Sequence, residues 1–215
     1  MKIRITFAKQ GALRYTGHLD LHKIWERAMR RADLPLAYSQ GFHPLPKIQL
    51  AAALPLGFSS RCELVDIKLE VDPDLAMLPE QIQQAVPGGL KILKVEAIDE
   101  KSPPLQTQVI AAEFEVTLFD EVDFAALTQR LDSVLAAASL PRERRGKPYD
   151  LRPLIEALRL LEPDAENHPR LWMQLTAREG ATGRPEEVLD VLGIRYEGTR
   201  VERSRFLFKV AENAV

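Results

Sequence analysis

Residues 2–35, KIRITFAKQGALRYTGHLDLHKIWERAMRRADLP, contain the pattern that decides the fold. From Lys2 to Phe7 polar and apolar side chains alternate, which predicts a half-buried strand. From His18 to about Ala32 apolar residues recur every three or four positions, which predicts a helix with one apolar face. The proline at the end of the quoted stretch cannot continue that helix. A strand followed by a helix therefore begins the chain.

Further elements follow up to residue 100. We expect strands near Ile48–Leu54, Glu63–Val71 and Leu90–Ile98. A short helix should start at the sequence Asp72-Pro73-Asp74 and run to about Val86. The resulting order, β-α-β-β-α-β, is that of a ferredoxin-like domain.

The same order of elements recurs in the second half of the chain. The proline-containing stretch from Lys101 to Pro104 is typical of a linker. After it we expect a strand, a helix, a basic hairpin-like segment, two strands, a helix and a last strand: Val109–Phe119, Asp123–Ala138, Arg142–Arg152, Leu154–Leu161, Leu171–Arg178, Pro185–Leu192 and Arg200–Val210. The sequence therefore predicts an α+β protein of two tandem ferredoxin-like (βαββαβ) halves, residues 1–100 and 109–215, joined by a linker over 101–108.

The composition excludes several classes of protein. With 46% hydrophobic and 28% charged residues in 215, the chain has an ordinary globular composition. No apolar run approaches the roughly 18–20 residues that cross a bilayer, and the N-terminus lacks the apolar centre of a signal peptide. The single cysteine, Cys62, can neither form an internal disulfide nor hold an iron–sulfur cluster, which takes about four thiolates. We expect a cytoplasmic protein without a membrane segment or a cluster of its own.

Charge is distributed unevenly along the chain. The net charge is −2, but residues 1–47 carry +6 and residues 141–153 carry +3, so the remainder carries −11. Separate basic blocks of this kind indicate a surface for an anionic partner. The alternative is that the charges only solvate the faces of ordinary helices and strands.

The first candidate site is the loop that leads into the predicted helix at His18. Backbone N–H groups at a helix start attract anions, and Arg14 and His18 would add donors there. Tyr15 offers a ring on which a nucleic-acid base could stack. We expect Arg30 and Arg31, at the end of the same helix, to contact phosphates as well. The alternative is an ordinary helix start with solvated side chains.

The second candidate site is the loop between Tyr38 and Lys47. One glycine and two prolines make this loop stiff, so it can hold Ser39, His43 and Lys47 in place as a binding site requires. The alternative is a structural connection in which Phe42 fills the core.

The third candidate site is the basic segment that begins at Arg142. Its basic residues flank a glycine at a predicted turn, and a tyrosine, Tyr149, follows, an arrangement that suits contact with a phosphate backbone. The residues expected to bind phosphate here are Arg142, Arg144, Arg145 and Lys147. The alternative is an exposed hairpin whose charges keep an edge strand soluble.

The histidines offer two further chemistries. His18 and His22 share a helical face, but a metal site would need a third ligand from His43 or Cys62, and the glutamate of the zinc-protease motif is absent, so we expect no metal or cofactor. His18 and His43 could instead cleave RNA without a metal, one activating the 2′ hydroxyl and the other protonating the leaving 5′ oxygen. No P-loop, dinucleotide-binding or nucleophile-elbow motif is present, so no self-contained catalytic motif identifies an enzyme.

Several segments together match a known family. They are Gly17–Leu21, Glu26–Ala32, Leu34–Ile48, Ala53–Gly57 and Asp150–Pro153, and the string YSQGFHPLPKI from Tyr38 to Ile48 is the most specific. In these segments the chain resembles the radical-SAM-linked proteins, a bacterial domain often fused to, or encoded beside, a radical S-adenosylmethionine enzyme. It departs from that family at Gly17, where a serine is usual, and at His22.

The resemblance implies a partner of radical chemistry rather than its source. Our leading hypothesis is a binding module that holds an anionic substrate, RNA, for a radical S-adenosylmethionine partner enzyme. Two alternatives remain open: a metal-independent RNA-processing enzyme that uses His18 and His43, and a protein-interaction domain that recognises only the partner enzyme.

Overall fold

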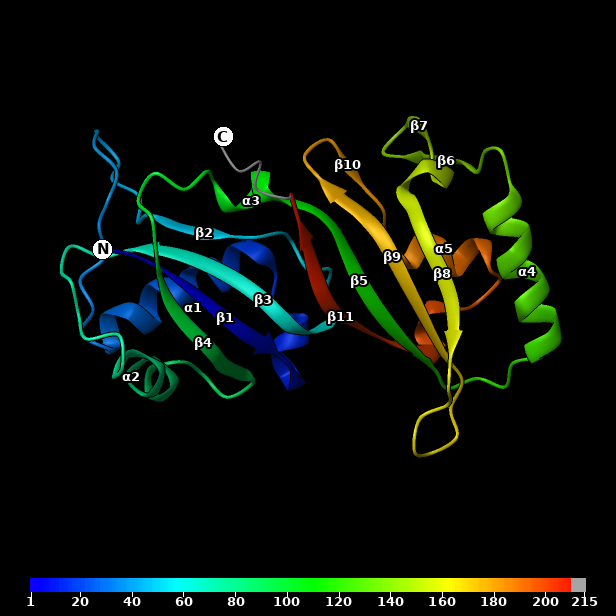
Figure 1. The fold of residues 1–215 in the computed structure, drawn as a ribbon, viewed down its shortest axis with the longest axis horizontal. Coiled ribbons are helices and arrows are strands. Elements are labelled where there is room, and N and C mark those ends of the chain that lie inside the picture. Colours follow the sequence, from blue (N-terminus) through cyan, green and yellow to red (C-terminus); the bar gives the residue numbers. More distant parts are fainter. Residues whose placement is uncertain (210–215) are drawn as a thin grey trace, which may run out of the picture. The chain divides into compact units, whose positions relative to one another are not determined.

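The chain folds into two compact units, which divide between Gln108 and Val109 in a computed structural model that describes residues 1–209. Both units combine helices with antiparallel strand pairs, and the described residues contain five α-helices, α1 to α5 (Figure 1). The predicted α+β class is therefore confirmed. None of the helices within residues 1–209 is long and apolar enough to cross a membrane.

Unit 1 is a four-stranded antiparallel sheet with two main helices. In chain order its elements are β1 (Lys2–Lys9), the 3₁₀ helix η1 (Gly11–Tyr15), α1 (His18–Arg31), β2 (Ile48–Leu50), β3 (Ser59–Lys68), α2 (Leu78–Ala85), β4 (Leu90–Ile98) and the short α3 (Leu105–Gln108). Within this unit β1 lies between β3 and β4, and β2 pairs with the other side of β3. The spatial order is therefore β4-β1-β3-β2.

The core of unit 1 follows from the two periodicities of the opening sequence. The alternating apolar residues of β1 are fully buried, as is Trp25 on the apolar face of α1. The rings of Phe7 and Trp25 meet edge to face with centroids 4.9 Å apart. Because α2 contributes Leu78 and Ile82 to the same cluster, both helices pack on one apolar layer.

Unit 2 repeats the order of the main elements and inserts a hairpin. Its elements are β5 (Val109–Leu118), α4 (Phe124–Ala136), β6 (Pro141–Arg144), β7 (Lys147–Asp150), η2 (Arg152–Leu154), β8 (Ile155–Leu161), β9 (Arg170–Arg178), β10 (Ala181–Thr182), α5 (Pro185–Val191), η3 (Tyr196–Gly198) and β11 (Thr199–Phe208). β5 lies between β9 and β11. β8 and the short β10 both pair with β9, one after the other along its length.

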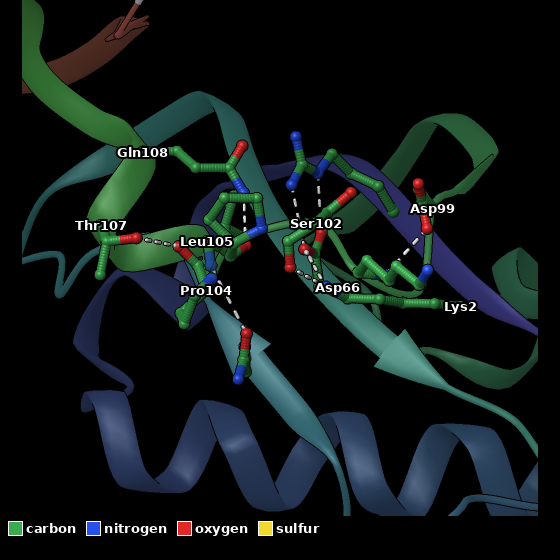
Figure 2. A network of polar contacts seen from close by, with 12 residues as sticks. Lys2, Asp66, Asp99, Ser102, Pro104, Leu105, Thr107 and Gln108 are labelled. Atoms are coloured by element: carbon green, nitrogen blue, oxygen red, sulfur yellow. Dashed lines mark hydrogen bonds and ion pairs between the residues drawn. The ribbon is translucent and has the colours of Figure 1, made fainter. Parts of the chain in front are cut away.

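The segment expected to be a linker belongs to unit 1. Leu105 is fully buried, and its N–H donates to the side chain of Gln49 at 3.5 Å. Figure 2 shows Lys2 between this segment and β3, with Nζ 3.4 Å from the carbonyl oxygen of Ser102 and 3.6 Å from the carboxylate of Asp66. The predicted linker therefore ends in the short helix α3 and has hydrogen bonds to unit 1.

Several element boundaries differ from the sequence prediction. The helix α2 begins at Leu78 instead of Asp72, because Asp74 caps a preceding turn by accepting a hydrogen bond from the N–H of Ala76 at 3.0 Å. β2 ends at Leu50, four residues early. The predicted end of the last strand, Val210, lies outside the described residues.

Candidate functional site

The basic segment that the sequence singles out in unit 2 is a separate two-stranded hairpin, β6–β7. Arg144 pairs with Lys147 across it, and the two residues between them, Arg145 and Gly146, have φ of 51° and 74°. Positive φ at both central residues defines a type I′ turn, whose twist matches that of the strands. The predicted turn at Gly146 is therefore present, and Arg145 has a backbone conformation that residues other than glycine seldom adopt.

The base of this hairpin is fixed to the rest of unit 2. Nη2 of Arg142 lies 2.5 Å from Oδ2 of Asp190 in α5, and its Nε lies 3.8 Å from Oε2 of Glu187. Oδ1 of Asp150 accepts hydrogen bonds from the N–H groups of Leu140 at 2.7 Å and Arg152 at 2.9 Å. These two backbone bonds lower the pKa of Asp150 below its ordinary value. Arg142 thus anchors the hairpin against two carboxylates.

The tip of the hairpin carries the remaining three cations. Arg144, Arg145 and Lys147 are all exposed, and none of them makes an ion pair with any residue of 1–209. This contrasts with Arg142, whose side chain is mostly covered. Of the four side chains predicted to bind phosphate in this segment, three are thus accessible to a ligand, and the fourth, Arg142, anchors the hairpin.

A cavity of about 520 Å³ lies beside the hairpin tip within unit 2. The cations of the tip line it, together with Tyr149 and with Arg184, which precedes α5. Thr182 of β10 is also a lining residue. Asp150 is the carboxylate among the lining residues, and its Oδ1 already accepts two backbone bonds. The cavity therefore presents mainly positive charge.

Sequence reasoning missed part of this cavity. Arg184 and Thr182 come more than thirty residues after the hairpin, in a stretch where no motif marks them. The signal that could have found this turn of chain is Gly180, which has φ of 77° between β9 and β10. It indicates a second hairpin, but not that this hairpin faces the first.

In unit 1 the start of α1 gathers Arg14, Tyr15 and His18. The carbonyl oxygen of Arg14 accepts a hydrogen bond from the N–H of Gly57, and its guanidinium lies 5.6 Å from the centre of the Tyr15 ring, which is 68% exposed. Gly17 supplies no side-chain cap to α1. Partial burial lowers the pKa of His18, and His22 lowers it further against an opposing effect of Glu63. At neutral pH His18 therefore offers a hydrogen bond rather than a positive charge.

The end of α1 is less suited to a phosphate. Nη2 of Arg30 lies 3.3 Å from Oε1 of Glu26, and Nη1 of Arg31 donates to the carbonyl oxygen of Ala85 at 2.5 Å. Arg30 also lines a cavity of about 590 Å³ together with three carboxylates, those of Glu26, Asp33 and Glu70. Acidic neighbours disfavour an anionic ligand at this position.

The loop before β2 is closed by hydrogen bonds of Ser39, and Phe42 does not fill the core. The hydroxyl and the N–H of Ser39 both bond to the backbone of Leu45, at 3.0 and 2.9 Å, so this serine closes the loop. Phe42 is fully exposed at 103%. His43 and Lys47 are exposed as well. The structural alternative considered for Phe42 is therefore wrong.

The paired histidines of α1 have separate surroundings. The ring Nε2 of His22 lies 3.3 Å from the carbonyl oxygen of Ile48, and His18 occupies the first turn of the helix. Within residues 1–209 no group of three or more His, Cys, Asp and Glu side chains is placed to hold a metal ion.

Comparisons with known proteins give a family and a fold. The family model described as "Uncharacterized protein conserved in bacteria (DUF2344)" matches residues 2–185. No curated protein matches the chain.

The chain is similar to chains in solved structures. A chain in the crystal structure of a Cbf5-Nop10-Gar1 complex is 10% identical, with a TM-score of 0.50 over 95% of this chain and 48% of that chain. The chain thus spans about half the length of that relative, and the likeness shows the mixed α+β fold alone. A structure described as a glycine cleavage system transcriptional repressor is 12% identical over 97% of this chain and 98% of that chain, and its TM-score of 0.25 carries no argument.

Proposed function

Because the chain belongs to the bacterial family DUF2344, whose description assigns no activity, we propose a function from its own side chains. It is a binding module that holds RNA, as an anionic polymer, for a radical S-adenosylmethionine partner enzyme. The observation that carries the RNA part is the tip of the β6–β7 hairpin, where Arg144, Arg145 and Lys147 project without ion pairs in the described residues.

The hairpin suits a phosphate backbone for a physical reason. Cations that are already neutralised gain little from a phosphate, whereas exposed cations without partners release the counterions of the polymer when they bind. The anchored base, with Arg142 held by Asp190, keeps the three cations together on one short hairpin. In unit 1, Arg14 before α1 and Lys47 before β2 supply further half-exposed and exposed cations, and Tyr15 supplies an exposed ring.

The fold of each unit is compatible with a binding module. Strand orders of β4-β1-β3-β2 in unit 1 and β8-β9-β5-β11 in unit 2 lead us to interpret both as ferredoxin-like modules. Such a fold does not determine a function, so the RNA proposal depends on the cations. The partner enzyme is proposed from the resemblance carried by the Tyr38–Ile48 string.

RNA binding is tested by its dependence on salt. We expect a labelled single-stranded RNA to bind with a log–log salt slope that falls in magnitude by about 2 when the three tip cations are replaced by alanine, since each phosphate contact contributes about 0.7. The matched control replaces two other exposed arginines and a lysine of unit 2, Arg159, Arg200 and Lys209, which do not line the cavity. Binding that is undetectable, or that changes equally in both triple variants, would contradict the proposal.

The partner is tested by co-purification. The chain should retain a radical S-adenosylmethionine enzyme from its own cells, and nuclease treatment should weaken that association if RNA connects the two. Retention that is unaffected by nuclease would support the protein-interaction alternative instead.

A further inference from the structure

The cavity beside the hairpin is lined by two segments that are far apart in the sequence. One wall is the β6–β7 hairpin, and the other is β10 with the residues that lead into α5. The N–H of Gly183 donates to the carbonyl oxygen of Thr176 at 2.8 Å, and a Cβ at Gly183 would lie 2.8 Å from the carbonyl oxygen of Leu154. The second wall is therefore packed closely against the chain that follows the hairpin.

Both walls are thus held in place before any ligand arrives. The hairpin wall is fixed by Arg142 and Asp150, and the β10 wall by Gly183. A site whose groups are already ordered loses less conformational entropy on binding, so its affinity is higher for the same contacts. A volume of about 520 Å³ lies within the range of small-ligand sites, roughly 300–1,000 Å³.

The lining groups specify the chemistry of a ligand. Four cations line the cavity and favour an anion: the three of the hairpin tip, which are unpaired within residues 1–209, and Arg184, whose Nη1 lies 3.5 Å from Oε1 of Glu186. Tyr149 adds a half-buried aromatic ring, and burial, followed by the nearby carboxylate of Glu187, raises the pKa of its hydroxyl, so the ring stays neutral. Thr182 adds an exposed hydroxyl on a short strand. A ligand that combines a phosphate with a flat, hydrogen-bonding ring matches all three kinds of group.

We infer that this cavity binds a single nucleotide, with the phosphate at the cations and the base against Tyr149. The inference rests on the proposed function, in which the nucleotide is an unpaired or terminal residue of the bound RNA. The inference adds that the protein binds one nucleotide in a defined site. Contacts to the phosphate backbone alone would bind RNA at any position.

A nucleotide site is tested with free ligands. A nucleoside monophosphate should bind to the full chain in calorimetry, more tightly than either the nucleoside or inorganic phosphate. Thr182→Trp should lower that affinity by about tenfold or more, because the indole fills the cavity without changing the charge. Thr128→Trp, at an exposed position on α4, is the control and should leave binding unchanged.

A second variant guards against a failure of Thr182→Trp to fold. Arg184→Gln removes one lining cation and should weaken the monophosphate much more than the nucleoside. If RNA binds with the expected salt slope but the monophosphate does not bind, or binds equally well to both variants, the nucleotide site is overturned and the RNA-binding function stands. If the monophosphate binds in the expected way but RNA does not bind, the RNA-binding function fails and the cavity is a site for free nucleotides.

Discussion

The guanidinium of Arg4 and the carboxylate of Asp66 face each other directly across β1 and β3, with two hydrogen bonds of 2.7 and 3.0 Å. Asp66 is only 1% exposed. Arg4→Met should therefore lower the free energy of unfolding by about 3–5 kcal/mol, because within residues 1–209 it leaves the buried Asp66 with the more distant Lys2 as its remaining ion-pair partner. Urea denaturation measures the change.

The paired replacement is the control for this prediction. Arg4→Met combined with Asp66→Leu removes both charges and should recover most of the lost stability, since a buried ion pair seldom exceeds a well-packed apolar pair. A loss as large as the sum of the two single variants would show that the two side chains do not depend on each other.

Neighbouring glycines before β4 should respond very differently to alanine. Gly89 has φ of 96°, and a Cβ there would lie 2.8 Å from the carbonyl oxygen of Gln10, whereas a Cβ at Gly88 would meet nothing within 4 Å. We expect Gly89→Ala to destabilise unit 1 by at least about 1–3 kcal/mol and Gly88→Ala to be within about 0.5 kcal/mol of the unmodified chain. Equal melting temperatures for the two variants would refute this assignment of strain.

The base of the hairpin should confer a pH-dependent stability. Because the N–H groups of Leu140 and Arg152 lower the pKa of Asp150, the folded state binds fewer protons here than the unfolded state. The contribution is present at neutral pH and is lost as the pH falls below the ordinary value of 3.8. Thermal unfolding of Asp150→Ala should thus differ from the unmodified chain at pH 7 and converge with it in acid. Asp150→Asn keeps the acceptor oxygen and should show a smaller loss at pH 7.

The titration of His18 should change the folding stability near pH 6.5, above the range in which Asp150 acts. Burial and His22 lower its pKa in the folded state, so the unfolded state takes up a proton more readily as the pH falls through 6.5. The unmodified chain should lose stability there relative to His18→Asn, which cannot titrate. Urea midpoints at pH 7.5 and at about pH 5.5 give the comparison. Parallel pH profiles for the two proteins would mean that the ring titrates as in the unfolded chain.

Local patterns predicted much of the fold. The helix expected from His18 to about Ala32 is α1, His18–Arg31, because its apolar spacing and the proline after it act within a few residues. The start of α2 was not predicted correctly, since Asp74 can cap a turn as readily as a helix, and only the packing of Leu78 decides between the two.

The sequence predicts which residues form the candidate site, but not which residues they contact in the fold. The sequence around Gly146 predicts both the turn and the cations that surround it, and these cations are exposed in the structure. That Arg142 would differ from Arg144 depends on Asp190, which lies 48 residues away and is brought near by the fold of unit 2. The spacing of residues along the chain cannot predict such a long-range contact.

The chain has two tryptophans, and each unit contains one of them. Trp25 is fully buried beside Phe7, whereas Trp172 in β9 is partly exposed beneath the guanidinium of Arg159, 4.4 Å from the centre of its ring. Their intrinsic fluorescence should therefore differ in emission wavelength, and replacing either indole by phenylalanine would leave a single optical probe. Such probes would reveal whether the two units melt together or in succession.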